Sequence, residues 1–360
     1  MPIQDKDNVF YDQTDGFGSS LIDTVKFRLR LEHEPLVDMV EGNPNLRRHG
    51  ARFTVDSKFP GVRANVWSPA DNQSLVIEAS VAKFLTGQNV FGLYDLDDAC
   101  YELGHEVLER LGLEIDSEVE TTLADGAMEL LRVDAAAHLK CESGEQAAAV
   151  MAALRRLAVT ADGDWAAIKN ETVTLGSWSR RRTFTIYRKD RELIKRPPSR
   201  SVWRRAHLLA AAENSMRFEL SLAGQELRSQ GVVIAHELRP WHLFEQLWDW
   251  FHRVAGTARP LPVIADIEGL PGALALRMRA WQLGDANAFA VAPSTRRQYR
   301  QRVLERTGID INSPLSADEQ REALKTVRDA LVGGLTVCDR SDLWGRMKAG
   351  RRGLDQSRAR

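Results

Sequence analysis

The chain has 360 residues, of which 43 % are hydrophobic and 28 % are charged, and its formal net charge is −1. This length favours two domains over one, and the composition is ordinary for a soluble globular protein. No apolar run approaches the roughly 20 residues that span a bilayer. The first 20 residues lack the apolar core of a secretion signal, and the three cysteines match neither a disulfide framework nor a zinc site, so we expect a cytosolic protein.

Although the net charge of the chain is close to zero, two of its segments carry large and opposite charges. Residues 179–205 hold eleven Lys and Arg against two acids, and residues 92–130 hold twelve acids against one Arg. A basic block of this kind is one signature of a surface that binds nucleic acid. The alternative is a basic face that is neutralised by the acidic block.

Alternating apolar and polar residues predict strands in the first two thirds of the chain. In residues 24–32, Val25 and Phe27 share one face while Lys26 and Arg28 share the other. Further strands are predicted at 51–56, 61–67, 74–80, 130–141 and 215–222, and residues 174–193 are predicted to form a hairpin that turns near Gly176.

Helices are predicted from caps and from helical periodicity. Asp95 is a suitable N-cap for a helix to Leu111, and Ser143-x-x-Gln146 forms a capping box for a helix to about Ala158. Other helices are predicted at 199–213, 240–254 and 273–285, at 294–308 behind a capping box of Thr295 and Gln298, and from Ser316 to about Val332.

This order of elements predicts an α+β fold with an antiparallel sheet, followed by a small helical domain that resembles a helix-turn-helix. No internal repeat is evident in the sequence. The expected segments are an irregular N-terminus (1–20), an α+β domain (21–255), a linker (256–262), a helical domain (263–335) and a disordered basic tail (336–360).

Three predicted strands each place a carboxylate on the face away from the core. These carboxylates are Glu78, Asp134 and Glu219, and His138 shares the face of Asp134. Carboxylates that converge in this way suit a hard divalent cation such as Mg²⁺, to which an imidazole can add a nitrogen ligand. The alternative for each acid is a solvated ion pair on an exposed strand.

A fourth strand places Tyr187 on its polar face, together with Thr183 and Thr185. A tyrosine can act as a covalent nucleophile on phosphorus if cations offset the developing charge. Lys189 lies two residues further on and is expected on the same strand face, and nearby arginines supply positive charge. The alternative is a structural tyrosine.

Several blocks, in order, resemble the gene II replication initiators of filamentous bacteriophages. They are LIDTVKFRLRL, IEASVAKFLTGQNVFGLYDL, LRVDAAAH, TVTLGSWSRRRTFTIYRKDREL and RFELSL, and they fall within residues 21–255. The resemblance implies a sheet of the HUH-endonuclease class and an enzyme that nicks one strand of a double-stranded origin. A tyrosine would form a 5′-phosphotyrosine link, leave a 3′-OH primer, and later rejoin the displaced strand.

Carried onto this sequence, the resemblance makes Tyr187 the nucleophile and Lys189 its catalytic partner. It implies Mg²⁺ or Mn²⁺ held by Asp134, Glu219, Glu78 and His138, although none of the eight histidines forms the His-hydrophobe-His motif of many rolling-circle initiators. The expected DNA-binding residues are Lys83, Arg132, Arg180, Arg181, Arg182, Arg188 and Arg217.

Residues 263–335 resemble the C-terminal region that some of these phages also make separately as the gene X product, for which Met278 is a candidate start. There Arg296, Arg297 and Arg300 recur along one helix and are candidates for DNA contact. The resemblance further implies double-stranded origin DNA, displaced single-stranded phage DNA, a host helicase and polymerase, and self-association on the origin as partners in the bacterial host cytoplasm, with no membrane.

A rival interpretation is a non-catalytic DNA-binding regulator on the same fold. It predicts salt-dependent origin binding without metal-dependent cleavage. The three acids argue against it, because carboxylates beside phosphates are costly unless a metal lies between them.

Overall fold

The structure is a computed structural model that describes residues 20–50, 52–160, 167–169, 172–176, 179, 181–199, 202, 205–238, 243, 246, 270–282, 288–307, 311–312, 322–323, 325–327 and 329. The chain divides into two compact units. The first unit holds the chain up to Leu130 together with Val232–Glu245, and the second holds Leu131–Gly231 and Gln246–Thr336.

The described residues of the first unit form five antiparallel strands in the order β2-β3-β4-β5-β1. The predictions at 24–32, 51–56, 61–67 and 74–80 are confirmed, while the short β2 was not predicted. The strands are β1 (Leu21–Arg30), β2 (Leu46–His49), β3 (Arg52–Asp56), β4 (Arg63–Trp67) and β5 (Ser74–Ser80).

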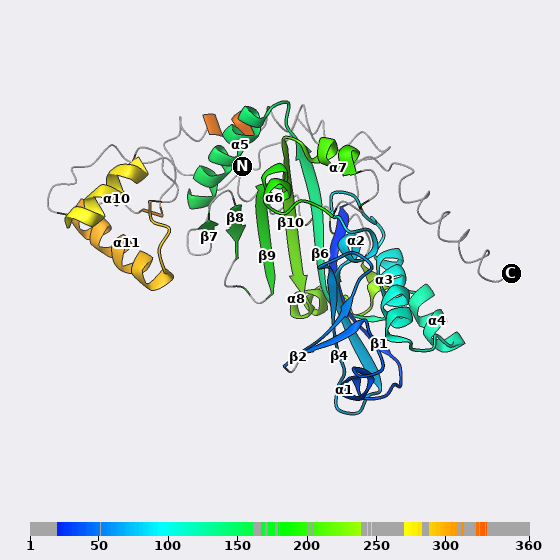
Figure 1. The fold of residues 1–360 in the computed structure, drawn as a ribbon. Coiled ribbons are helices and arrows are strands. Elements are labelled where there is room, and N and C mark those ends of the chain that lie inside the picture. The colour runs from blue at the N-terminus through cyan, green and yellow to red at the C-terminus, as the bar shows by residue number, and fades with distance from the viewer. Residues whose placement is uncertain are drawn as a thin grey trace. The chain divides into compact units, whose positions relative to one another are not determined.

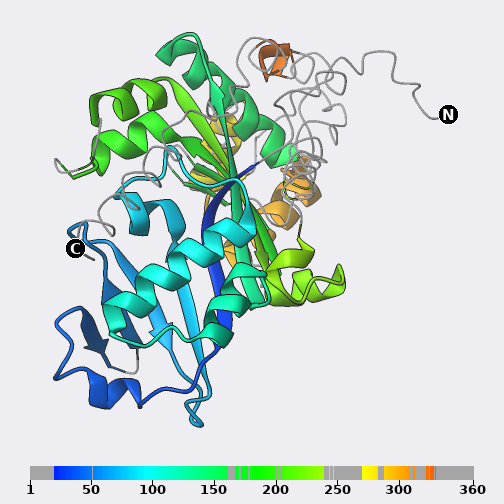
Figure 2. The same cartoon turned by 90° about the vertical axis from the view of Figure 1, so that its right-hand side faces the viewer.

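One face of these strands is buried under helices (Figure 2). In β1, Val25 and Phe27 are fully buried, whereas Lys26 and Arg28 on the other face are partly exposed. Gly104 lies in the helix Leu96–Leu111. A Cβ at this position would lie 2.7 Å from Leu123 and 3.6 Å from Phe27, so glycine lets the helix lie close to both side chains. The helices of this unit are α1 (Leu36–Met39), α2 (Val81–Thr86), α3 (Leu96–Leu111), α4 (Ser117–Ala124) and the 3₁₀ turn η1 (Ala235–Glu237).

In the part of the second unit that the structure describes, five antiparallel strands lie in the order β7-β8-β9-β10-β6 (Figure 1). The predicted hairpin is confirmed, and Gly176 turns the chain with a φ of 65°, which disfavours a side chain. The strands are β6 (Glu129–Lys140), β7 (Ala167–Lys169), β8 (Thr172–Leu175), β9 (Arg182–Arg188) and β10 (Ser215–Ala223).

The helices of the second unit begin where local chemistry favours them. At α5 the Ser143 Oγ accepts a hydrogen bond from the Gln146 amide at 3.1 Å, which confirms the predicted cap. The strand prediction beyond Arg188 was wrong, because the chain turns into α6 with Asp190 and Glu192 in its first turn, where the helix dipole favours acids. These helices are α5 (Gly144–Thr160), α6 (Lys189–Lys195), α7 (Arg205–Ala212) and α8 (Gly224–Ser229).

Two further helices, α10 (Gly272–Gln282) and α11 (Pro293–Thr307), confirm the helical prediction for the C-terminal part. They share a small core that includes Leu274, Met278 and Val303. The predicted cap at Thr295 was wrong, because α11 already begins at Pro293, a residue that suits the first helical position.

Several predictions fall on residues that the structure describes only in part or not at all. The linker 256–262 and the tail 336–360 lie outside the described residues, and so do most residues of the predicted helix 240–254 and both capping residues of the helix predicted from Ser316. Over the described ranges, no helix combines the length and the apolar character that crossing a membrane requires. The α+β class with antiparallel strands and flanking helices is confirmed.

The N-cap of α3 provides a test of this local account. The Asp95 carboxylate accepts a hydrogen bond from the Asp98 amide at 3.1 Å. Asp95→Ala should lower the free energy of unfolding by about 1 kcal/mol in urea denaturation, whereas Asp95→Asn should remain close to wild type because it keeps an acceptor oxygen. Equal losses in both variants would contradict the capping role.

Candidate active site

The strands of the second unit bring the predicted tyrosine and two of the predicted acids onto one face. Register pairs Arg217 of β10 with Tyr187 of β9 on one side and with His138 of β6 on the other. Directly paired residues of neighbouring strands project to the same face. Glu219 lies two residues from Arg217, and Asp134 is paired with Ser221, so all of these side chains share the polar face.

The centre of this face is a hydrogen-bonded group of three side chains. The Tyr187 hydroxyl donates to Glu219 Oε1 at 2.8 Å, and Arg217 Nε donates to the same oxygen at 2.7 Å. Arg217 has no exposed side-chain surface, whereas Glu219 remains 25 % exposed. Glu219 therefore holds the phenol of Tyr187 while it neutralises a buried guanidinium.

His138 is 6 % exposed, and its Nε2 lies 3.4 Å from Arg217 Nη1. Burial, followed by the charges of Arg217 and Lys189, holds the pKa of His138 well below its usual value. The imidazole is therefore neutral. Because an arginine can only donate, Nε2 accepts in this contact, which requires the proton to sit on Nδ1.

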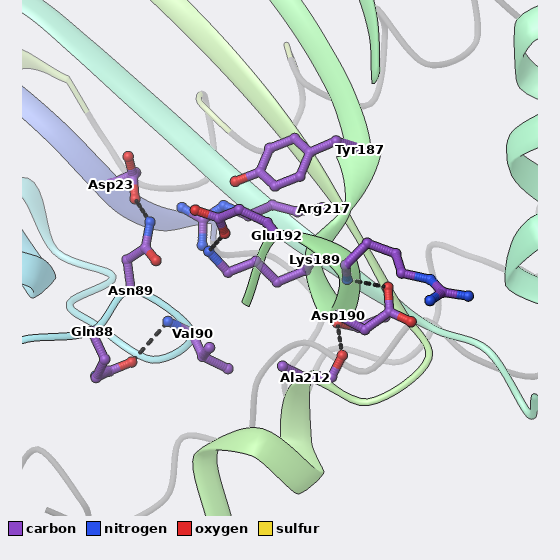
Figure 3. Close-up of polar contacts among 12 residues, drawn as sticks. Asp23, Gln88, Asn89, Val90, Tyr187, Lys189, Asp190, Glu192, Ala212 and Arg217 are labelled. Carbon is purple, nitrogen blue, oxygen red and sulfur yellow. Dashed lines mark hydrogen bonds and ion pairs between the residues drawn. The ribbon is translucent and has the colours of Figure 1, made fainter. Parts of the chain in front are cut away.

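Lys189 lies beside Tyr187, although not on the strand as predicted. It is the first residue of α6, and its Nζ lies 5.9 Å from the centre of the Tyr187 ring (Figure 3). The side chain is fully buried and forms an ion pair with Glu192. The cation beside the tyrosine therefore belongs to a helix, which the sequence periodicity did not predict.

Asp134 is held apart from this group by its own partner. Both of its carboxylate oxygens accept from Arg132, at 2.9 and 2.7 Å, and Arg132 Nε also lies 3.2 Å from the Ser221 hydroxyl. Asp134 lies on the polar face as expected and forms the ion pair that was its alternative interpretation, but the pair is not solvated at the carboxylate, because only 9 % of Asp134 is exposed. A bidentate pair of this kind fixes the carboxylate.

The proposed metal ligands do not fit an ion in this arrangement. Glu219 and His138 both contact Arg217, and Asp134 is engaged by Arg132. A cation bound by these donors would have to displace the two guanidinium groups. Within the described part of the chain, no group of three or more His, Cys, Asp or Glu side chains is close enough to hold a metal.

The predicted DNA-binding arginines differ in accessibility. Arg181 and Arg182 are 47 % and 40 % exposed and both contact Glu226, so they lie at the surface. Arg188 is only 4 % exposed, because it projects to the core side of β9 and pairs with Asp190. Arg217 is fully buried. The last two therefore lack the exposure that a DNA phosphate contact needs, while Arg180 lies outside the described residues.

The remaining candidates belong to other parts of the chain. Glu78 lies on β5 and Lys83 on α2, both in the first unit and both partly buried. On α11, Arg297 is exposed, and Arg296 and Arg300 are partly exposed. The connection from Gln282 to Pro293 is longer than the three- to four-residue turn of a helix-turn-helix.

Sequence reasoning missed the central roles of Arg217 and Glu192. Arg217 was expected among the DNA-binding residues, and its pairing with Glu219 was not predicted. The alternating Arg217-x-Glu219 spacing was the available signal, since it places a cation and a carboxylate on one face. Glu192 could be found only by recognising that a helix starts at Lys189.

The neutral state of His138 predicts a pH dependence of stability. In the unfolded state His138 binds a proton below about pH 6.5, whereas in the folded state it stays neutral there. The free energy of unfolding should therefore fall as the pH drops below that value. Between pH 7 and 5.5 the slope should reach at most about 1.4 kcal/mol per pH unit, measured by urea denaturation.

His138→Gln should flatten this slope because it removes the titrating group. His207→Gln is the matched control, since it makes the same substitution at an exposed histidine. A His138→Gln protein with the wild-type slope would contradict the buried neutral imidazole.

Comparison with known proteins shows which family the chain is similar to. Residues 21–240 match the sequence model of a family described as "Replication-associated protein G2P N-terminal". A solved structure described as the rolling circle replication initiator protein from Geobacillus stearothermophilus is similar at a TM-score of 0.32 and 13 % identity, covering 61 % of this chain and 79 % of that chain. No curated protein sequence matches the chain.

Proposed function

The chain belongs to the gene II-like family of phage replication initiators, and on that premise we propose that it nicks and rejoins one strand of a replication origin through Tyr187. Rolling-circle initiators are generally endonucleases. The observation that carries the proposal is the hydrogen bond from the Tyr187 hydroxyl to Glu219. It orients the phenol oxygen and provides an acceptor for its proton.

The proposed reaction exchanges one phosphate ester for another. The Tyr187 oxygen attacks phosphorus while its proton passes to Glu219, the bond from phosphorus to O3′ breaks, and the released 3′ oxygen takes up a proton. The product is a 5′-phosphotyrosine and a 3′-OH primer. Reversal by the 3′-OH at the end of the displaced strand would join that strand into a circle.

The buried cations beside the tyrosine have two roles in this proposal. Arg217 fixes the orientation of Glu219, because their contact is 2.7 Å and the guanidinium has no exposed surface. Lys189 lies near the tyrosine ring and is the nearby cation proposed to offset the negative charge that develops on the Tyr187 oxygen as it loses its proton. Arg181 and Arg182 are proposed to contact the DNA backbone, which their exposed side chains support.

The partners follow from the same proposal. They are double-stranded origin DNA and the displaced single strand, with a host helicase and polymerase to extend the primer and self-association on the origin. The exposed arginines of α11 are proposed as additional DNA contacts, and the bacterial host cytoplasm is the proposed location.

Tyr187→Phe removes only the nucleophilic oxygen. The variant should lose nicking of supercoiled origin DNA by more than about 1,000-fold while it retains origin binding in a gel-shift assay. Tyr101→Phe is the matched control, because the Tyr101 hydroxyl also donates to a carboxylate, Glu120, at 2.9 Å, and this variant should nick normally. A Tyr187→Phe protein that nicks at the wild-type rate would refute the proposal.

Metal dependence is a separate prediction, since HUH-type initiators generally use a divalent metal. Nicking should stop in EDTA and return when Mg²⁺ or Mn²⁺ is added. Asp134→Asn should leave the metal concentration needed for half-maximal nicking unchanged, because both carboxylate oxygens of Asp134 are already bonded to Arg132. Undiminished nicking in EDTA would show that the arginine-paired carboxylates act without metal.

A further inference from the structure

The two units share one strand order. In each unit, the first strand in the sequence pairs with the fifth. The fourth, third and second strands then follow the fifth across the sheet, and each is antiparallel to its neighbour. The strands β1, β2, β3, β4 and β5 therefore correspond to β6, β7, β8, β9 and β10.

The residue register extends this correspondence to single side chains. The last strand of each unit carries serine, glutamate and serine at the same spacing, which are Ser74, Glu78 and Ser80 in the first unit. Their counterparts in the second unit are Ser215, Glu219 and Ser221. In both units this serine-glutamate-serine strand pairs antiparallel with the first strand of its unit.

The position of the tyrosine is occupied by tryptophan in the first unit. Tyr187 is paired with the residue two before Glu219, and Trp67 is paired with Val76, the residue two before Glu78. A cation accompanies both rings, since Lys26 Nζ lies 4.3 Å from the centre of the Trp67 ring. Tryptophan has no hydroxyl, so the first unit lacks the nucleophile.

The two units also differ at other corresponding positions. The second unit has a buried ionic cluster there, whereas the first unit has an accessible basic face. The counterpart of the buried Arg217 is Val76, and the counterpart of the buried His138 is Arg28, which is 42 % exposed. Arg47 and Arg63 lie on the same face at 54 % and 46 % exposure.

This face carries more positive than negative charge. Its cations are Lys26, Arg28, Arg30, Arg47, Arg52 and Arg63, and its acids are Asp56 and Glu78, with Glu129 paired to Arg28. Burial opposes the charged form of Asp56, but hydrogen bonds from Arg47 and Arg63 outweigh it and lower the Asp56 pKa. Asp56 therefore holds both arginines at the surface.

We propose that this face of the first unit is a second DNA site, which binds a single strand by stacking a base on Trp67 and does not cut it. A partly exposed aromatic ring among cations is the arrangement that binds single strands, because the ring stacks on a base while the cations follow the phosphates. The inference goes beyond the nicking reaction and does not require Tyr187 to be the nucleophile.

The test uses the full chain carrying Tyr187→Phe, so that DNA is not cut, and a short single strand containing 5-bromodeoxyuridine. Ultraviolet light should cross-link this strand to the tryptic peptide Ala64–Lys83, which contains Trp67. Fluorescence anisotropy should show that Trp67→Ala weakens single-strand binding roughly 5- to 100-fold.

Trp67→Phe is the matched control, because it keeps an aromatic face and should bind within about threefold of the parent. Circular dichroism must show that both variants are folded. The proposal is overturned if Trp67→Ala binds as tightly as its parent, or if Trp67→Phe loses as much affinity as Trp67→Ala. Cross-linking of Ala64–Lys83 to a duplex but not to a single strand would also overturn it. Failure here leaves the nicking reaction intact, since that reaction is measured separately.

Discussion

A buried guanidinium requires a carboxylate beside it, and in this protein that requirement organises the candidate site. Arg217 is fully buried, and an unpaired charge in such a place would cost several kcal/mol. Glu219 meets the requirement and is thereby fixed in orientation. The same oxygen then accepts the Tyr187 hydroxyl, so the position of the phenol depends on a charge pair beneath it.

The polar side of the strands could be predicted from sequence because side chains alternate along a strand. That rule placed Tyr187, Glu219 and Asp134 on non-core faces, and the register brings these three side chains onto one face. The burial of Arg217 could not be predicted in this way. Alternation distinguishes two faces, but it does not reveal that both faces of a strand are covered.

The position of Lys189 shows a second limit. A spacing of two residues puts Lys189 with Tyr187 only if the strand continues, and the chain instead becomes helical at Lys189. The lysine still lies near the ring because the helix begins directly after the strand. The correspondence of the two units could not be seen in the sequence either. Apart from the serine and glutamate positions, the corresponding strands of the two units share few residues. Register, which sequence alone does not provide, was needed to align Trp67 with Tyr187.

The most direct test of the central claim is to identify the residue that becomes attached to DNA. The wild-type protein is incubated with a cleavable origin strand, digested with nuclease and protease, and examined by mass spectrometry. We expect a nucleotide 5′-phosphate on the hydroxyl of Tyr187, in an amount that matches the fraction of strand nicked. Nicked DNA with the phosphate on another residue, or with no covalent protein at all, would contradict it.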